Sequence, residues 1–245
     1  FTFTYDALGN ILTKSKDGVT ATYGYEDRGT SYANPHAVTS MTTGADTTIF
    51  TYDSHGNLVS KNQIGTETLY SWNYNDTLSG IVSSASATPL IYAYDTSRSR
   101  ILSSKISTTT IPTFYPTLAY SNNGATSTLH VITNFGSLAT IAHGNTASTS
   151  SVSYTIPDLL SSHTLSTDTT GLAIEVVEYM PYGSIQVDDT TDGTIADTRQ
   201  YIGEYQDGDT GLSYLNARYY EGSRAGFLSQ DPVFWELKQN LANPQ

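Results

Sequence analysis

The most regular pattern along the chain is an aromatic residue followed two positions later by a tyrosine. The run Phe-Thr-Tyr-Asp occupies residues 3–6 and returns unchanged at residues 50–53. Residues i and i+2 of a strand point to the same face of a sheet, so each pair places two rings on one side. The pattern therefore predicts β-strands that each carry an aromatic step on one face.

The residues after each pair are typical of a tight turn. An Asp directly after Tyr5 or Tyr52 can accept hydrogen bonds from backbone N–H groups of the turn. Gly9 and Gly56 follow three residues later, where a positive φ is expected, and an apolar residue two positions further on starts the next strand. Weaker copies extend the series, so five strand–turn–strand units are predicted to start at Tyr5, Tyr25, Tyr52, Tyr74 and Tyr94.

One such unit cannot bury its aromatic face alone, whereas stacked neighbours can. The repeats fade after about residue 102. Thr- and Ser-rich segments at 128–133 and 151–156 are predicted to be strands, residues 188–198 to be an acidic surface loop, and residues 233–241 to be a short helix.

Composition and charge narrow the class of protein. The chain has 245 residues, no Cys, 14% charged residues and a formal net charge of −12. The absence of Cys excludes disulfides, thiol catalysis and cysteine-based zinc sites. A nucleic-acid partner would need a basic stripe, and the sequence has none. No apolar run has membrane-spanning length, so we expect no membrane span, and these residues contain no signal-peptide pattern. Because the chain begins without an initiator Met, we expect it to be a piece of a longer polypeptide.

Candidate sites for metals and cofactors are weak. The five histidines stand singly without ligand spacing, and no phosphate-binding or dinucleotide-binding glycine motif occurs. Residues 207–211 resemble the start of a calcium loop but lack the third ligand and the later Glu. We expect a turn in which Asp side chains bond backbone amides. The sequence thus predicts no metal and no cofactor, and a chelator should leave the melting temperature unchanged.

The segment from Arg199 to Pro232 carries the most specific motifs. It contains Arg-Gln-Tyr-Ile-Gly, Asp-Gly-Asp-Thr-Gly-Leu, a Tyr-rich strand expected over residues 213–220 with Ala-Arg-Tyr-Tyr, and a closing Asp-Pro. This order resembles the RHS-repeat-associated core of RHS proteins, teneurin-like proteins and the C components of Tc toxins. The Tyr-Asp units likewise resemble the YD repeats of that family.

The resemblance implies an all-β fold and a domain order. YD-repeat β-hairpins would wind into a spiralling sheet that forms part of a hollow shell, closed by the RHS-repeat-associated core. The expected divisions are YD/RHS repeats at residues 1–102, degenerate repeats and pre-core strands at 103–198, and the core at 199–245.

The resemblance also identifies two candidate catalytic residues. In family members that cut themselves, the Arg of Ala-Arg-Tyr-Tyr and the Asp of Asp-Pro act in an aspartate-type autoproteolysis that frees a C-terminal cargo. Arg218 and Asp231 stand at these positions. The second Asp and the scissile bond of such relatives correspond to positions after Gln245. The alternative is that Arg218 and Asp231 form a buried structural ion pair.

Three functions follow as hypotheses. The first is a fragment of a secreted or cell-surface bacterial protein whose β-shell encloses and presents a C-terminal toxin or effector, as in polymorphic and Tc-type toxins. The second is an extracellular adhesion module that contacts a cell-surface protein or glycan and exposes an aromatic patch. The third is an enzyme such as a glycoside hydrolase, which needs two carboxylates about 5–10 Å apart in a cleft.

Overall fold

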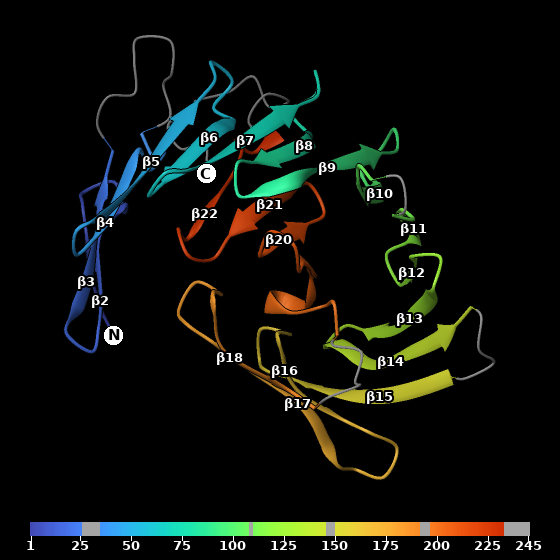
Figure 1. Cartoon of the computed structure of the whole chain (residues 1–245). Coiled ribbons are helices and arrows are strands. Elements are labelled where there is room, and N and C mark those ends of the chain that lie inside the picture. Colours follow the sequence, from blue (N-terminus) through green and yellow to red (C-terminus); the bar gives the residue numbers. More distant parts are fainter. Residues whose placement is uncertain (26–34, 108–109, 146–149, 192–196, 233–245) are drawn as a thin grey trace. The chain divides into compact units, whose positions relative to one another are not determined.

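The computed structural model of the chain describes residues 1–25, 35–107, 110–145, 150–191 and 197–232. Within these residues it is all-β, and no helix is long and apolar enough to cross a membrane. Eighteen strands belong to one antiparallel sheet in which strands pair with their neighbours in sequence, and four more form a second sheet (Figure 1). The predicted all-β class is confirmed. The helix expected at 233–241 lies outside the described residues.

The chain divides into two compact units. Unit 1 comprises Phe1–Ile91 and Leu228–Gln245, and unit 2 comprises Tyr92–Phe227. The boundary falls inside a strand of the large sheet, and the three divisions expected from the sequence stay a prediction.

Unit 1 is a meander of short strands joined by tight turns. Its strands are β1 (Thr2–Tyr5), β2 (Ile11–Lys16), β3 (Val19–Gly24), β4 (Ser40–Thr43), β5 (Asp46–Tyr52), β6 (Leu58–Gln63), β7 (Thr66–Trp72), β8 (Leu78–Ser83) and the first part of β9 (Ser86–Tyr94).

The repeat turn has the predicted construction. Asp53 Oδ1 accepts hydrogen bonds from the backbone N–H groups of His55 and Asn57, both at 2.9 Å. Gly56 has a φ of 83° and donates its N–H to the Asp53 carbonyl at 3.1 Å. The next residue but one, Leu58, is fully buried. The Asp6 turn repeats this geometry, with Asp6 Oδ1 accepting the Leu8 and Asn10 N–H groups and Gly9 at a φ of 85°, as the local sequence predicts.

The fourth predicted unit has a different register from the one expected. Its aromatic pair is Tyr70 and Trp72, and Asn73 takes the Asp position, with Asp76 N–H donating to the Asn73 carbonyl at 3.0 Å. Tyr74 lies in the turn and is 97% exposed. The assignment of a unit to Tyr74 was therefore wrong because Trp replaces Tyr and Asn replaces Asp in this copy.

Residues that follow unit 2 in sequence return to unit 1. The Leu58 amide donates to the Leu228 carbonyl at 2.7 Å, and Leu228 is fully buried. The Gln230 side chain packs so closely on Gly56 that a Cβ added there would lie 2.7 Å from it. Gly56 is thus required both for its positive φ and for this approach.

Unit 2 continues the meander and adds the second sheet. The meander contains the end of β9, β10 (Arg100–Lys105), β11 (Thr113–Thr117), β12 (Tyr120–Asn122), β13 (Thr126–Thr133), β14 (Gly136–Gly144), β15 (Ser150–Pro157), β16 (His163–Thr167), β17 (Ala173–Tyr179) and β18 (Ile185–Thr190). The second sheet contains β19 (Tyr205–Asp207), β20 (Leu212–Leu215), β21 (Arg218–Glu221) and β22 (Gly226–Phe227), preceded by the 3₁₀ turn η1 (Tyr201–Gly203). The predicted strands at 128–133 and 151–156 are confirmed as parts of β13 and β15.

Within unit 2 the sheet β13–β17 curves, and η1 lies on its concave side (Figure 1). The Tyr-rich strand expected over residues 213–220 is in fact a hairpin, because Asn216 adopts a φ of 59° and reverses the chain between β20 and β21. The acidic segment is also not a loop throughout. Asp188 and Asp189 belong to β18, and Asp197 is buried.

Candidate functional site

A buried cluster of histidines and carboxylates joins the meander of unit 2 to the segment before η1. His130 comes from β13, His163 from β16 and Glu175 from β17, while Asp197 precedes η1. Their side chains are at most 1% exposed. The expectation of a surface loop at Asp197 was wrong because this carboxylate has polar partners inside the protein.

The contacts of Asp197 explain its burial. Its Oδ2 accepts a hydrogen bond from Thr140 Oγ1 at 2.9 Å, and its Oδ1 accepts one from the Arg199 backbone N–H at 2.9 Å. His163 Nδ1 lies 3.7 Å from Asp197 Oδ2, and His130 Nδ1 lies 3.6 Å from Asp197 Oδ1. A buried carboxylate is tolerated only with such a full set of donors.

Glu175 completes the cluster from the other side of His163. Its Oε2 lies 3.2 Å from His163 Nε2 and accepts the Asp197 backbone N–H at 3.1 Å. Gln200 adds a link, because its side-chain amide donates to the Asp197 carbonyl at 2.9 Å and accepts from the Tyr179 hydroxyl at 2.8 Å.

The two histidines differ in charge. Burial alone lowers the pKa of His163, but hydrogen bonding to Asp197 and Glu175 outweighs burial and raises the pKa to about 9. Burial lowers the pKa of His130, and the charge of Asp197 does not compensate. Burial raises the pKa of Asp197, yet His163 and the other donors more than offset it, so the pKa is lowered. At neutral pH the cluster therefore contains a protonated His163 and a neutral His130.

The cluster brings together histidines that appeared isolated in the sequence. Even so, the described residues contain no group of three His, Cys, Asp or Glu side chains arranged to hold a metal ion. With its side chains closed off from solvent, the cluster cannot receive a substrate. Its chemical role is to fix the segment around Asp197 to β13, β16 and β17.

A second cluster centres on Arg100 at the start of β10. Its Nη1 donates to both carboxylate oxygens of Asp207, at 2.7 and 2.9 Å, and to the Tyr219 hydroxyl at 3.0 Å. The guanidinium carbon also lies within 6.0 Å of the ring centroids of five tyrosines, a geometry that stabilises a desolvated cation. These rings belong to Tyr92, Tyr115, Tyr205, Tyr214 and Tyr219.

The Asp207 turn differs from the sequence expectation. It is a turn, with Gly211 N–H donating to the Asp207 carbonyl at 2.8 Å. However, the carboxylates do not bond its amides, since Asp207 pairs with Arg100 and Asp209 Oδ1 lies 2.6 Å from Lys105 Nζ. Burial alone lowers the pKa of Arg100, but the Asp207 charge raises it well above its ordinary value.

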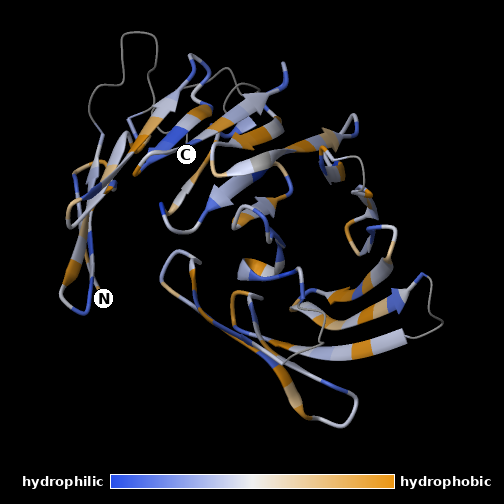
Figure 2. Ribbon diagram, viewed as in Figure 1, coloured by the Kyte–Doolittle hydropathy of each residue, from blue (hydrophilic) through white to orange (hydrophobic). Residues whose placement is uncertain are grey.

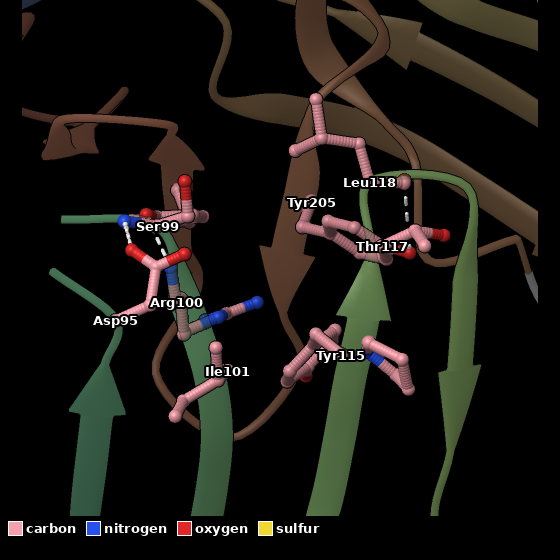
Figure 3. Close-up of a pocket in the computed structure, with 10 residues that line it drawn as sticks. Asp95, Ser99, Arg100, Ile101, Tyr115, Thr117, Leu118 and Tyr205 are labelled. Carbon is pink, nitrogen blue, oxygen red and sulfur yellow. Dashed lines mark hydrogen bonds between the residues drawn. The ribbon is translucent and has the colours of Figure 1, made fainter. Parts of the chain in front are cut away.

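A small cavity of about 220 Å³ opens beside this cluster. Its walls include Tyr115, Leu118 and Tyr205, and Figure 3 shows the Arg100 side chain extending between Ile101 and these rings. Asp95 lies at the other wall, where its Oδ1 accepts the Ser99 N–H at 2.9 Å. The Arg100 side chain is only 1% exposed, and the polar residues Asp95, Ser99 and Thr117 share the lining with the aromatic and aliphatic groups.

The two residues predicted to be catalytic lie in different units. Arg218 opens β21 and is half-buried, with its guanidinium carbon 3.6 Å from the Phe227 ring centroid. Asp231 is half-buried and follows the segment that returns to unit 1. The pairing of Arg218 with Asp231 stays a prediction.

The neighbours of Arg218 in its motif have a clear structural role. Tyr219 is 2% exposed and bonds Arg100, while the buried Tyr220 donates its hydroxyl proton to the Tyr182 carbonyl at 2.9 Å. The motif thus contributes two buried tyrosines, Tyr219 and Tyr220, to the core of unit 2. Arg218 precedes them and follows the turn at Asn216.

Sequence reasoning missed Arg100 and His163, although a signal was present. Both stand five residues after a turn Asp, Asp95 and Asp158 respectively. In unit 1 the same position holds a buried Ile or Leu. An ionisable residue at a position that is otherwise apolar indicates a buried partner of opposite charge.

Comparison with known proteins defines the class of fold. No family model matches the chain, and no curated protein matches it. Solved structures of Tc toxin components do match. The chain is similar to the crystal structure of TcdB2-TccC3-TEV, with 19% identity, a TM-score of 0.59, and coverage of 95% of this chain and 14% of that chain.

Two further structures agree. The crystal structure of TcdB2-TccC3 gives 18% identity and a TM-score of 0.58, and the Photorhabdus luminescens Tc holotoxin pore carrying a TccC3 mutation gives 19% and 0.59. Each comparison covers 95% of this chain and 14% of the other. The chain therefore has the fold of a segment of these Tc toxin components and spans about a seventh of their length.

Proposed function

We propose that the chain is a segment of an RHS/YD-repeat shell that encloses and presents a C-terminal effector in a secreted or cell-surface bacterial toxin. The observation that carries the proposal is the likeness of 95% of the chain to Tc toxin structures. The core-like motif order between Arg199 and Pro232 agrees with it. The effector would follow Gln245 in the parent protein.

The two buried clusters suit this role. A container must hold its closing segment against the wall, and here Asp207 of that segment and Asp197 just before it pair with Arg100 and His163 from the meander. Breaking a buried pair of this kind costs about 3–5 kcal/mol, so each pair resists detachment strongly.

The burial of the tyrosines in the core-like segment (Arg199–Pro232) favours a container over an adhesion module. Tyr205, Tyr214 and Tyr219 of the core-like segment are buried against one another and against Arg100. An adhesion module would need such rings at the surface to contact glycans or proteins.

We further propose that the parent cleaves itself with Arg218 and Asp231 as participants. In an aspartate-type reaction one carboxylate removes a proton from water, and the resulting hydroxide attacks the scissile carbonyl. A second carboxylic acid then protonates the departing amine as the C–N bond breaks. Arg218 would keep one carboxylate ionised, and the second Asp and the scissile bond would lie after Gln245.

Intact-mass analysis of the parent, expressed to its natural C-terminus, tests the cleavage. Wild type should break downstream of Gln245, and Arg218→Ala and Asp231→Asn should stay uncut. Asp209→Asn is the matched control, because it removes an exposed carboxylate from the same segment and should leave cleavage intact. A cut band in Asp231→Asn would refute the catalytic role and leave a structural ion pair.

Limited proteolysis tests the container separately. The downstream segment should resist protease at concentrations that digest the same segment expressed alone, whether or not the parent is cleaved. Equal digestion of the two would overturn the shell and favour the adhesion module.

A further inference from the structure

The two faces of the curved sheet in unit 2 have opposite chemistry. Directly paired residues share a face, and the rows His130–Thr140 and Thr155–Ser166–Glu175 form the face that η1 and the core-like segment cover. These side chains are all buried. The covered face is therefore largely polar, with Ala142 and Val177 as buried apolar members, and this is unusual for the protected side of an antiparallel sheet.

The opposite face, called here the open face, is apolar. On β15 it presents Val152, Tyr154 and Ile156, which alternate with the covered Thr155. Each lies in a row across several strands, and the register gives the rows Leu129–Ile141–Val152, Val131–Ala139–Tyr154 and Ile156–Leu165–Val176. Figure 2 shows the corresponding hydrophobic bands on β13–β15.

Most of these side chains are exposed to solvent, although Ile141, Val152 and Leu165 are half-buried and Ala139 is buried. Tyr154 is 49% exposed, Ile156 53%, Leu129 42% and Val131 43%. Contiguous apolar surface spread over five strands is rare on a protein that works alone, and it marks an interaction site. We call this surface the apolar patch, comprising Leu129, Val131, Ile141, Val152, Tyr154, Ile156, Leu165 and Val176.

The charge around the apolar patch has one sign. No Lys or Arg occurs between Lys105 and Arg199, so strands β11–β18 carry no permanently charged basic side chain. Glu178 follows Val176 two residues later on the open face, and Asp189 pairs directly with Val176. Both carboxylates are exposed and border the patch along β17 and β18.

The corresponding surface of unit 1 lacks this character. There the row Thr51–Ser60–Leu69–Val82 begins with hydroxyl groups, and Thr51 Oγ1 lies 2.7 Å from Ser60 Oγ. Leu69 and Val82 are each 45% exposed but have polar neighbours. The apolar patch is thus a feature of unit 2, and unit 1 offers a matched internal control.

We propose that the apolar patch docks a protein segment whose apolar strip is bordered by Lys or Arg. Binding would bury the exposed Leu, Ile, Val and Tyr side chains of the patch. Glu178 and Asp189 would select a partner whose border is basic. A second copy of this chain is a poor partner, because its acidic edges and net charge of −12 would repel the acidic border of the patch. Anionic lipid would be repelled for the same reason.

A labelled amphipathic helical peptide of Leu and Lys provides the probe, with a Leu/Glu peptide of the same pattern as its control. Fluorescence anisotropy should show micromolar binding of the Lys peptide and none of the Glu peptide. Tyr154→Thr/Ile156→Thr should weaken binding about tenfold, because it removes two central apolar contacts while keeping β-forming side chains. Glu178→Gln/Asp189→Asn should weaken binding less and flatten its salt dependence.

Leu69→Thr/Val82→Thr in unit 1 is the matched control and should leave the affinity unchanged. Equal loss in this control, or no loss in either patch variant, would place the peptide elsewhere and overturn the proposal. So would the absence of micromolar binding to wild type. A concentration-dependent dimer in sedimentation, or flotation with anionic vesicles, that Tyr154→Thr/Ile156→Thr abolishes would replace the basic segment with a second copy or a membrane.

Discussion

Units 1 and 2 build the same Asp turn but bury different chemistry five residues after the Asp. In unit 1 this position holds Ile11, Leu58 and Leu78, which are 8%, 0% and 1% exposed. In unit 2 it holds Arg100 and His163 after Asp95 and Asp158, buried at 4% and 1%, whereas Ala173 after the Asp168 turn is exposed. Where the position is buried, the residue type decides which partner the side chain needs.

The difference has an energetic consequence. A buried Leu is stabilised by any apolar neighbours of suitable shape, whereas a buried Arg or protonated His needs a specific carboxylate. Asp207 provides one carboxylate from the core-like segment (Arg199–Pro232), and Asp197 provides the other from two residues before that segment. The buried Leu and Ile positions of unit 1 therefore accept any well-packed apolar neighbours. Arg100 and His163 of unit 2 each require a particular carboxylate.

The largest expected effect comes from removing one member of the Arg100 pair. Arg100→Leu should destabilise unit 2 by about 3–5 kcal/mol, because Asp207 is left buried without its cation. The double variant Arg100→Leu/Asp207→Leu should recover most of this loss. Urea denaturation followed by tyrosine near-UV circular dichroism measures both, and a double variant as unstable as the single one would contradict the pairing.

The equivalent change in unit 1 should be costly for a different reason. Leu58→Ala should destabilise unit 1 by about 3 kcal/mol through a cavity. Trp72, whose Nε1 donates to the Leu58 carbonyl at 2.8 Å, provides a fluorescence signal for this unit. Because no charge is involved, the loss should be the same at pH 6 and pH 9, and a pH-dependent loss would break the comparison.

The His163 position should make unit 2 sensitive to alkaline pH. The pKa of His163 rises from about 6.5 when unfolded to about 9 when folded, so its contribution is complete below about pH 6.5 and is lost as pH rises through 9. The loss is on the order of 3 kcal/mol. Denaturant midpoints of wild type should fall over this window, while those of His163→Gln should stay level. A parallel fall in both would assign the dependence to other groups.

The smallest effect is expected at Tyr74. Tyr74→Ser should change the free energy of unfolding by less than about 0.5 kcal/mol, since the ring is 97% exposed in a turn. Trp72→Ala, by contrast, should cost more than about 2 kcal/mol by removing a packed ring. Thermal melts of the two variants distinguish them, and a large loss at Tyr74 would restore it as a repeat position.

The sequence was sufficient for the repeat turn and the all-β class, because Asp, Gly and alternating aromatics act through contacts between near neighbours. It misplaced the fourth unit, since Trp72 and Asn73 replace the Tyr and Asp that define the pattern. It also took Asp197 for a surface residue. That error arose because the side chains that contact the Asp197 carboxylate, those of His163, Thr140 and His130, are 34 to 67 residues distant in sequence and no local signal indicates them.

The role of Arg218 and Asp231 could be proposed only from resemblance. Neither residue type nor spacing shows which carboxylates meet in space, and the two residues belong to different units. Arg100 was more accessible to sequence reasoning, because it follows the recognised repeat at Tyr94 and stands at a position that is apolar in unit 1. His163 lies where the repeats fade, and only its spacing from Asp158 indicates it.

Because Leu58 bonds to Leu228, unit 1 cannot complete its folding until most of the chain has been synthesised. A ribosome that has just produced Leu58 must add about 170 more residues before Leu228 exists, which takes roughly 10–30 s at typical elongation rates. Until then the Leu58 amide lacks the Leu228 carbonyl as its acceptor, and the turn at Gly56 lacks the packed Gln230 side chain. The nascent chain therefore passes through a waiting period in which all of unit 2 is made before unit 1 can be finished.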